Sequence, residues 1–404
     1  MLREVFAMKE KVHSWISALL MLALFALCLP GTAHAQTASA AAPLEEGVPV
    51  ELSCVSAILI DAATGQVIFE KNADEERPVA SVTKIMTILL TLEALDAGTI
   101  SLSDTVTVSP NAAGMGGSQA LLDANAPYKI EDLLKSTIIA SANDSAVALA
   151  EAISGAQEAF VERMNARAQE LGLKNTHYVN CTGLPAQGQY TTARDVAQLS
   201  RELDKYPTYY AYSTIWMDTI EHKGGRMTDL TNTNRLVRFY SDCDGYKTGS
   251  TNEARYCISA TAKRGDLRLI AVVLAAPAGQ TRFDEARKML EYGFANYQIV
   301  KPVIEGAKLN MNVAVRLGAR DMVETAAGGT AQVLVRKGQE KNLSLEIALP
   351  EEVEAPVRAG DLIGQINVLL DGEQIASVDA VAAETVEMPG MLDALLRILK
   401  GWRI

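Results

Sequence analysis

Seven residues, Ala80-Ser81-Val82-Thr83-Lys84-Ile85-Met86, decide how the rest of this 404-residue sequence is interpreted. They open a run in which apolar residues recur at helical spacing through Leu92. We therefore predict a helix that begins near Ser81 and ends near Asp96. Residues three apart share a helical face, so Ser81 should lie beside Lys84 in the first turn, a nucleophile next to a potential base. Alone, this S-x-x-K spacing also suits a surface serine and a solvated lysine.

Two later stretches supply further motifs at wide separations. The first contains Ser141-Ala142-Asn143, and the second contains Lys247-Thr248-Gly249. S-x-x-K, S-x-N and K-T-G, in this order, form the motif set of penicillin-binding proteins and class A β-lactamases. Each later motif also has an ordinary explanation, a helix cap for the S-x-N residues and a turn for K-T-G. Their joint occurrence favours an acyl-transfer site.

Beyond these motifs, the chain resembles the D-alanyl-D-alanine carboxypeptidases, low-molecular-mass penicillin-binding proteins of the S11 serine peptidase type. The resemblance is carried by Glu131–Lys135 before the second motif and Thr251–Ala254 after the third, and it extends from about Ser56 to the C-terminal tail. It implies a hydrolase that removes the terminal D-alanine from peptidoglycan stem pentapeptides ending in D-Ala-D-Ala. It also implies covalent inhibition by β-lactam antibiotics, a role in cell-wall synthesis and cell shape, and no metal or other cofactor.

The expected chemistry begins with Ser81, which is a weak nucleophile until a base takes its proton. Lys84 can be that base only as a neutral amine, and partial burial and a second cation, Lys247, would both lower its pKa. The resemblance implies that Ser81 attacks the carbonyl carbon of the penultimate D-alanine. It also implies that Ser141 helps to pass the proton to the leaving amine.

The resemblance further implies which residues hold the substrate. Asn143 would hydrogen-bond the substrate backbone, and Lys247 and Thr248 would hold its terminal carboxylate. Gly249 would let the strand edge approach the peptide closely. The backbone N–H groups of Ser250 and of the nucleophile would bind the oxyanion.

The same fold also supports other functions, among them β-lactamase and DD-endopeptidase activity. A class A β-lactamase needs a deacylating glutamate, usually in an E-x-x-x-N pattern between the second and third motifs. No glutamate in that interval has asparagine four residues later: Glu151, Glu158, Glu162, Glu170, Glu202 and Glu221. DD-endopeptidase action on cross-links stays open, as does a non-catalytic sensor or scaffold, against which the intact motifs argue. Neither H-E-x-x-H nor G-x-S-x-G occurs, so zinc-peptidase and Ser–His hydrolase functions lack support.

The composition of the chain limits the classes of molecule that it is expected to bind. Hydrophobic residues make up 49% of the chain, as in globular proteins, and a net charge of −12 argues against nucleic-acid binding. Four cysteines follow the N-terminal segment, Cys54, Cys181, Cys243 and Cys257, and we expect buried thiols rather than a Cys243–Cys257 disulfide. Cys181 also stands where the resembled family commonly has proline.

Both ends of the chain indicate export and membrane attachment. Residues 1–35 have the charged start, apolar stretch and small-residue cleavage site of a signal peptide, and residues 36–48 have the composition of a linker. Residues 388–404 form a predicted amphipathic helix with basic neighbours and a terminal tryptophan. Its last fourteen residues, Met391 to Ile404, would form a helix about 21 Å long, which is shorter than the hydrocarbon core of about 30 Å, so the helix should lie in the membrane interface. We therefore expect a protein anchored peripherally on the outer face of the cytoplasmic membrane.

The order of strand and helix signals predicts an α+β fold. A strand-like hairpin at Ser56–Glu70 is separated from later strand signals, which return at Gly245, by a mainly helical insertion. This pattern predicts an antiparallel sheet flanked by helices, which matches the penicillin-binding and β-lactamase-like fold. We assign residues 49–300 to this catalytic domain. Residues 301–387, rich in alternating β-branched runs, are assigned to a small all-β domain that resembles the family's stalk.

Overall fold

The structure, a computed structural model, describes residues 50–391. Its principal sheet has five antiparallel strands in the order β2-β1-β9-β8-β7. The sheet combines an N-terminal hairpin with three strands from much later in the chain. These strands are β1 (Ser56–Asp61), β2 (Val67–Lys71), β7 (Cys243–Thr251), β8 (Arg255–Arg264) and β9 (Leu267–Ala276). The predicted antiparallel sheet with a long insertion is confirmed.

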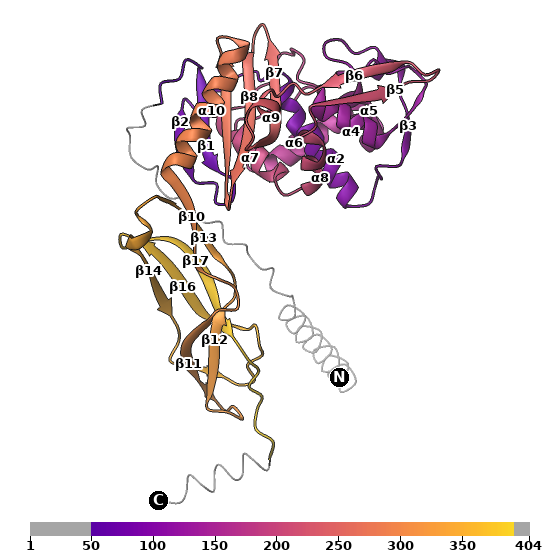
Figure 1. Ribbon diagram of the computed structural model, residues 1–404. Coiled ribbons are helices and arrows are strands. Elements are labelled where there is room, and N and C mark those ends of the chain that lie inside the picture. The colour runs from indigo at the N-terminus through magenta and orange to yellow at the C-terminus, as the bar shows by residue number, and fades with distance from the viewer. Residues whose placement is uncertain (1–49, 392–404) are drawn as a thin grey trace, which may run out of the picture. The chain divides into compact units, whose positions relative to one another are not determined.

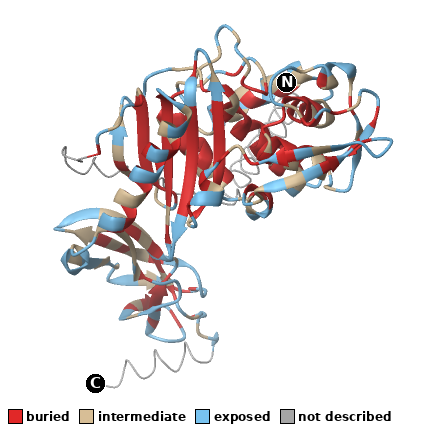
Figure 2. Ribbon diagram, turned by 45° about the horizontal axis from the view of Figure 1, so that its top comes forward, coloured by how far each residue is buried: buried red, intermediate tan, exposed pale blue. Residues whose placement is uncertain are grey.

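Both faces of this sheet are covered. Successive side chains of a strand point to opposite faces, so Ile58 and Ile60 enter one hydrophobic core while Leu59 enters another. The first core includes α2 (Lys84–Asp96), and the second includes α10 (Gly279–Asn296). Figure 1 shows α10 against the sheet, and Figure 2 shows the sheet strands as largely buried. This double coverage holds β7 and the first turn of α2 in fixed positions.

The insertion between β2 and β7 carries most of the helices. The mainly helical character expected for this insertion is confirmed. The described elements of the insertion are η1 (Ala80–Thr83), α2, β3 (Thr105–Thr107), α3 (Pro110–Ala113), β4 (Pro127–Lys129), α4 (Ile130–Ile139), α5 (Asn143–Ser154), α6 (Gln157–Glu170), α7 (Ala193–Leu203), α8 (Pro207–Ser213), β5 (Met217–Glu221), β6 (Met227–Thr231) and α9 (Leu236–Phe239).

The hairpin of β5 and β6 was not expected from the sequence. Each strand buries a single side chain completely, Ile220 in β5 and Leu230 in β6, and most of the other side chains are exposed. Two buried residues do not produce an alternation strong enough to be recognised as strands. The pairing is nevertheless a regular antiparallel ladder from Met217–Thr231 to Glu221–Met227.

A second group of strands follows α10, as expected for the C-terminal part. Two small hydrophobic cores lie among these strands, one around Ile366 and Val368 and the other around Val323 and Val357. The elements are β10 (Tyr297–Val303), β11 (Lys308–Arg316), β12 (Met322–Ala327), β13 (Ala331–Arg336), η2 (Glu340–Asn342), β14 (Leu343–Ala348), β15 (Glu352–Glu354), β16 (Leu362–Leu370) and β17 (Glu373–Ala382). Their largest sheet has the order β14-β16-β17-β12-β11-β15.

The predicted signal peptide (1–35) and linker (36–48) lie outside the described residues, as does the predicted terminal helix (388–404) beyond Met391. Across residues 50–391, no helix combines the length and the apolar character that crossing a bilayer requires. The strand β10 runs across the predicted boundary between residues 300 and 301.

The four cysteines are free and buried, as expected. Cys243 and Cys257 lie in the neighbouring strands β7 and β8 but are not opposite one another. Cys243 faces Ala262, and Cys257 faces Gly249. This register separates the two thiols along the ladder.

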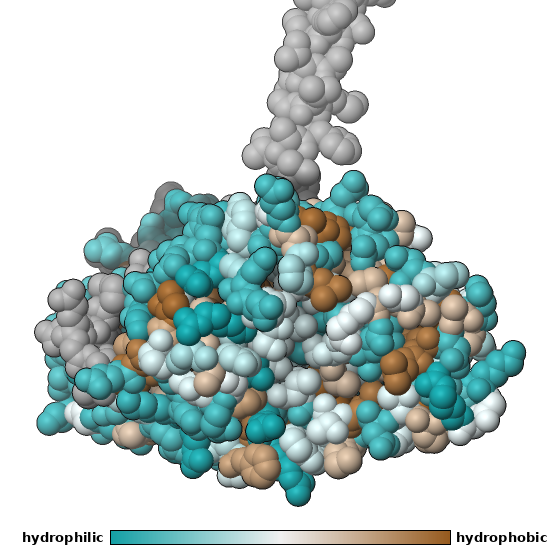
Figure 3. Space-filling model, turned by 90° about the horizontal axis from the view of Figure 1, so that it is seen from above, coloured by the Kyte–Doolittle hydropathy of each residue, from teal (hydrophilic) through white to brown (hydrophobic). Residues whose placement is uncertain are grey.

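The upper face of the molecule is mainly hydrophilic. In Figure 3, polar residues cover most of the coloured surface, and hydrophobic residues form small, separate patches. Scattered apolar residues of this kind are normal for a protein surface. This face therefore has the character of a surface in contact with water.

Candidate active site

Ser81 and Lys84 meet where the short helix η1 continues into α2. The Lys84 Nζ lies 3.0 Å from the Ser81 Oγ, so the two side chains are neighbours, as predicted. Ser81 is half-buried, whereas Lys84 is completely buried. The residue before the serine, Ala80, has a positive φ of 49°. Such strained backbone costs on the order of 1–3 kcal/mol and is often found at active sites.

The Lys84 amine is held by three oxygen atoms. Besides Ser81, it contacts the Asn143 Oδ1 at 2.5 Å and the Thr182 carbonyl at 2.7 Å. An ammonium group can donate to all three oxygens. After losing one proton, the amine can still donate to Asn143 and Thr182 while its lone pair faces the Ser81 hydroxyl. The geometry therefore suits a base that accepts the serine proton.

Burial lowers the pKa of Lys84 to about 7, and the nearby Cys181 and Asp144 act in the opposite direction. The expected help from Lys247 is not the cause of this shift. The repulsion instead adds to the effect of burial on Lys247, whose pKa is lowered well below its usual range by burial, by Lys84 and by Arg282. Removing an ammonium group from water favours its neutral form, so burial alone can produce the shift of Lys84.

The second motif lies between α4 and α5. Asn143 bridges two segments, because its Oδ1 accepts from Lys84 and its Nδ2 donates to the Gly116 carbonyl at 2.7 Å. Ser141 has a positive φ of 61°, and its buried Oγ has no hydrogen-bond partner among the described residues. The N-cap of α5 is Ala142, without a side-chain hydrogen bond. The explanation of Ser141 and Asn143 as helix caps is therefore wrong.

The third motif lies in β7, at the edge of the sheet. Lys247 is almost completely buried, and its Nζ has one contact, the Thr248 carbonyl at 3.3 Å. The Thr248 hydroxyl donates to the Thr233 hydroxyl at 2.8 Å. Lys84 and Lys247 form no ion pair with a carboxylate within the described part of the chain. Two buried lysine amines therefore share this region without a carboxylate partner in an ion pair.

Glycine is required where β7 passes the Ser81 turn. A Cβ atom on Gly249 would lie 2.4 Å from the Val79 carbonyl oxygen and 2.9 Å from the Ser81 backbone nitrogen. Gly249 is therefore needed because the edge strand packs directly against the backbone of the first motif. The following residue, Ser250, is exposed. The structure therefore brings all three motifs together, although the roles of their residues remain predictions.

Several residues of this region were not singled out from the sequence. Gly183 packs against the Ser81 turn as Gly249 does, since a Cβ atom on Gly183 would lie 2.0 Å from the Ala80 carbonyl oxygen. Asp144 is completely buried and accepts hydrogen bonds from the backbone N–H groups of Ala120 and Leu122, which ties their loop to α5.

Arg282 lies at the start of α10 and donates to the Gly249 carbonyl at 2.9 Å. No local sequence pattern marks this arginine, because its contact spans 33 residues. Across residues 50–391, no group of three or more His, Cys, Asp or Glu side chains is arranged to hold a metal ion.

Comparison with known proteins gives consistent results. The family model described as D-alanyl-D-alanine carboxypeptidase matches residues 37–278, and the model for the C-terminal domain of penicillin-binding protein 5 matches residues 297–388. D-alanyl-D-alanine carboxypeptidase DacF of Bacillus subtilis is 39% identical over 348 residues, which cover 86% of this chain and 89% of that protein. DacC of Escherichia coli is 38% identical, with 82% and 84% covered.

Solved structures agree. The crystal structure of penicillin-binding protein 5 from Haemophilus influenzae superposes with a TM-score of 0.75 at 31% identity. The match covers 85% of this chain and all of that one.

We predict that Gly183→Ala destabilises the protein far more than Gly188→Ala. Both glycines have nearly the same φ, 83° and 85°, so alanine should be strained to a similar degree at either position. Only Gly183 adds a backbone clash, because the nearest atom to a Cβ on Gly188 is a Val179 methyl group at 4.0 Å. Urea unfolding should show an additional loss of about 1–3 kcal/mol for Gly183→Ala. Equal losses in the two variants would contradict the close packing on the Ser81 turn.

Proposed function

The chain belongs to the D-alanyl-D-alanine carboxypeptidase family, and we propose that it releases the terminal D-alanine of peptidoglycan stem pentapeptides through an acyl-enzyme on Ser81. One observation carries the proposal. The completely buried Lys84 amine lies 3.0 Å from the Ser81 hydroxyl, and burial lowers its pKa to about 7. This arrangement supplies a neutral base beside the nucleophile near neutral pH.

Acylation begins when the Ser81 hydroxyl transfers its proton to the Lys84 amine and the Oγ attacks the penultimate D-alanine carbonyl carbon. The negative charge that develops on the carbonyl oxygen is stabilised by the backbone N–H groups of Ser81 and Ser250. One such donor typically contributes about 3 kcal/mol to the transition state. The intermediate then collapses, the C–N bond breaks, and Ser141 relays a proton to the departing amine of D-alanine.

The carboxylate of the substrate supplies the anion that the two buried lysines lack. Lys247 and Thr248 bind this carboxylate, and its charge raises the pKa of Lys247, which keeps the ammonium form in the complex. Asn143 hydrogen-bonds the substrate backbone, because its side chain already lies between Lys84 and the Gly116 segment. Gly249 lets the substrate backbone lie along the edge of β7.

Water hydrolyses the acyl-enzyme in the second half of the reaction and restores Ser81. Penicillins acylate the same oxygen, and their acyl-enzyme persists because the second motif is not accompanied by a glutamate in an E-x-x-x-N pattern. This absence separates the proposal from β-lactamase activity.

We also propose how the chain is placed in the cell envelope. Residues 1–35 direct export, residues 49–300 and 301–387 form the catalytic and β domains, and residues 388–404 bind the outer face of the cytoplasmic membrane. The support is the alternation of leucines with basic residues from Leu392 to Trp402 in the sequence.

Incubation with a fluorescent penicillin and with a D-Ala-D-Ala pentapeptide tests the proposed chemistry. Wild-type protein should become stably labelled and release D-alanine. Ser81→Ala should lose on the order of 10⁴-fold or more of both rates, because no other oxygen can form the ester. Ser103→Ala, at an exposed serine of the same chain, should behave as the wild type. Undiminished labelling of Ser81→Ala would refute the assignment, and rapid turnover of the drug would indicate a β-lactamase.

The rate of acylation should depend on pH through Lys84. The neutral amine is the active form, and its pKa is about 7. The second-order rate constant for penicillin labelling should therefore rise about tenfold per pH unit below pH 7 and level off above it. Lys84→Arg should stay inactive throughout, since arginine does not lose its proton in this range. A wild-type rate that is constant from pH 5.5 to about 8.5 would exclude Lys84 as the base.

Deletion of residues 388–404 should release the protein from membranes. Without the apolar stripe, the net charge of the chain offers no attraction to an anionic surface. Sedimentation with vesicles of phosphatidylglycerol and phosphatidylethanolamine measures binding, and penicillin labelling of the truncated protein serves as the folding control. Unchanged sedimentation would contradict the anchor.

A further inference from the structure

Three consecutive carbonyl groups directly before Lys247 are each held by a side chain from outside the principal sheet. The Ser213 hydroxyl donates to the Asp244 carbonyl at 2.5 Å, and the Asn234 amide donates to the Gly245 carbonyl at 3.1 Å. The Tyr209 hydroxyl donates to the Tyr246 carbonyl at 3.1 Å. The pairing of β7 with β8 is irregular at this point, since its register shifts between Cys243 and Gly245. The ladder therefore leaves Asp244 without a paired residue in β8, whereas Gly245 and Tyr246 face Thr261 and Ala260.

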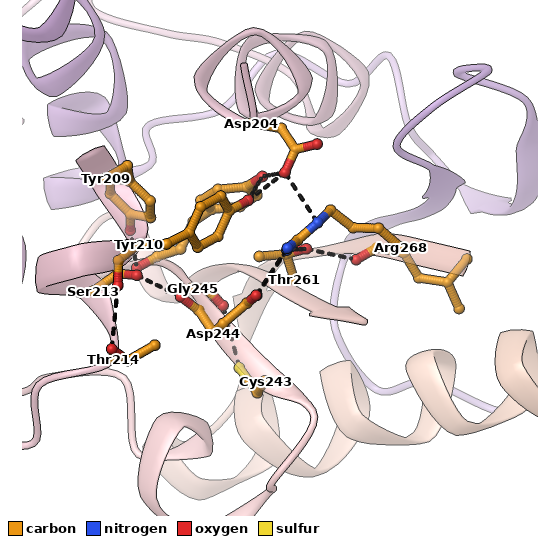
Figure 4. Close-up of polar contacts among 12 residues, drawn as sticks. Asp204, Tyr209, Tyr210, Ser213, Thr214, Cys243, Asp244, Gly245, Thr261 and Arg268 are labelled. Atoms are coloured by element: carbon orange, nitrogen blue, oxygen red, sulfur yellow. Dashed lines mark hydrogen bonds and ion pairs between the residues drawn. The ribbon is translucent and has the colours of Figure 1, made fainter. Parts of the chain in front are cut away.

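A guanidinium group connects this stretch to the interior of the sheet. Arg268 in β9 reaches across β8 and donates to both Asp244 carboxylate oxygens, at 2.8 and 2.9 Å. It also donates to the Thr261 hydroxyl of β8 at 3.1 Å. Figure 4 shows these contacts converging on Arg268. A bidentate arginine–carboxylate pair fixes direction as well as distance.

The same guanidinium group reaches Tyr246 through a second carboxylate. The Arg268 Nε lies 3.1 Å from the Asp204 Oδ1, just after α7. That oxygen also accepts hydrogen bonds from the hydroxyl groups of Tyr246, at 3.2 Å, and Tyr210. The Arg268 guanidinium lies over the Tyr210 ring, 4.5 Å from its centroid. Two of the three residues before Lys247 are thus connected to one arginine.

We infer that Arg268 is a positioning residue for Lys247 and Thr248. By holding Asp244 directly and Tyr246 through Asp204, it sets where the lysine ammonium and threonine hydroxyl meet the substrate's terminal carboxylate. This inference rests on the proposed carboxylate-binding role of Lys247 and Thr248. None of the network residues touches the reacting atoms, so their effect passes through β7.

The expected consequence is a loss of carboxylate recognition rather than a general loss of activity. A displacement of about 1 Å in a positioning group can cost about a hundredfold in rate. A substrate with a free terminal carboxylate uses Lys247 fully, whereas one that ends in D-alaninamide offers no anion. Misplacement of Lys247 therefore lowers turnover of the acid more than turnover of the amide, and general destabilisation lowers both equally.

The test compares kcat/KM for D-alanine release from an acyl-D-Ala-D-Ala peptide with kcat/KM for D-alaninamide release from its amide. Arg268→Lys keeps a positive charge but cannot form the bidentate pair. It should lower kcat/KM for the acid about ten- to a hundredfold and reduce the acid-to-amide ratio at least about fivefold. Tyr246→Phe removes one hydroxyl and keeps the ring, so it should reduce the ratio by a smaller factor. If Arg268→Lys does not fold, Tyr246→Phe decides the question.

Arg264→Lys is the matched control. Arg264 also bridges two carboxylates, Asp242 at 2.7 Å and Glu291 at 2.9 Å, but within the described part of the chain it forms no hydrogen bond or ion pair with a residue of β7. Its variant should keep the wild-type ratio. An unchanged ratio in folded Arg268→Lys and Tyr246→Phe would overturn the inference while leaving the carboxypeptidase intact. A wild-type protein that neither releases D-alanine nor binds penicillin would instead refute the proposed function.

Discussion

The burial of the Lys84 amine is the interaction on which the rest of this site depends. In water the amine would be protonated at neutral pH and unable to accept the Ser81 proton. Buried in α2 and held by Asn143 and the Thr182 carbonyl, it has a pKa of about 7, which suits its proposed role as the base. The packed helices and strands around this amine exclude the water that would stabilise its charged form, and this exclusion lowers its pKa.

The same burial places two lysine amines in an electrostatically unfavourable position. Two lysines are buried close together without a carboxylate partner in the described chain, which costs stability that a well-paired core would not lose. A carboxylate-bearing ligand removes this penalty when it binds. In the proposed mechanism, binding of the substrate carboxylate would relieve an unfavourable arrangement that already exists in the protein, in line with the trade-off between stability and activity common at active sites.

The features of the site that could be predicted from the sequence are those that depend on the spacing of nearby residues. Ser81 and Lys84 are one helical turn apart, and the three motifs occur in a recognisable order, so their grouping could be expected. The Thr182 carbonyl could not, because a backbone oxygen leaves no mark on residue type. Arg282 and Arg268 act across the sheet on residues 33 and 24 positions away, and the hairpin β5–β6 buries too few side chains to show alternation.

The turn that carries Ser81 lies between two backbone segments, and neither has room for a side chain where it meets the turn. Gly249 borders it on the sheet side and Gly183 on the loop side, and a methyl group on either would overlap the main chain of residues 79–81. A single substitution at either glycine would therefore displace the backbone of Ser81, the proposed nucleophile, without touching its side chain.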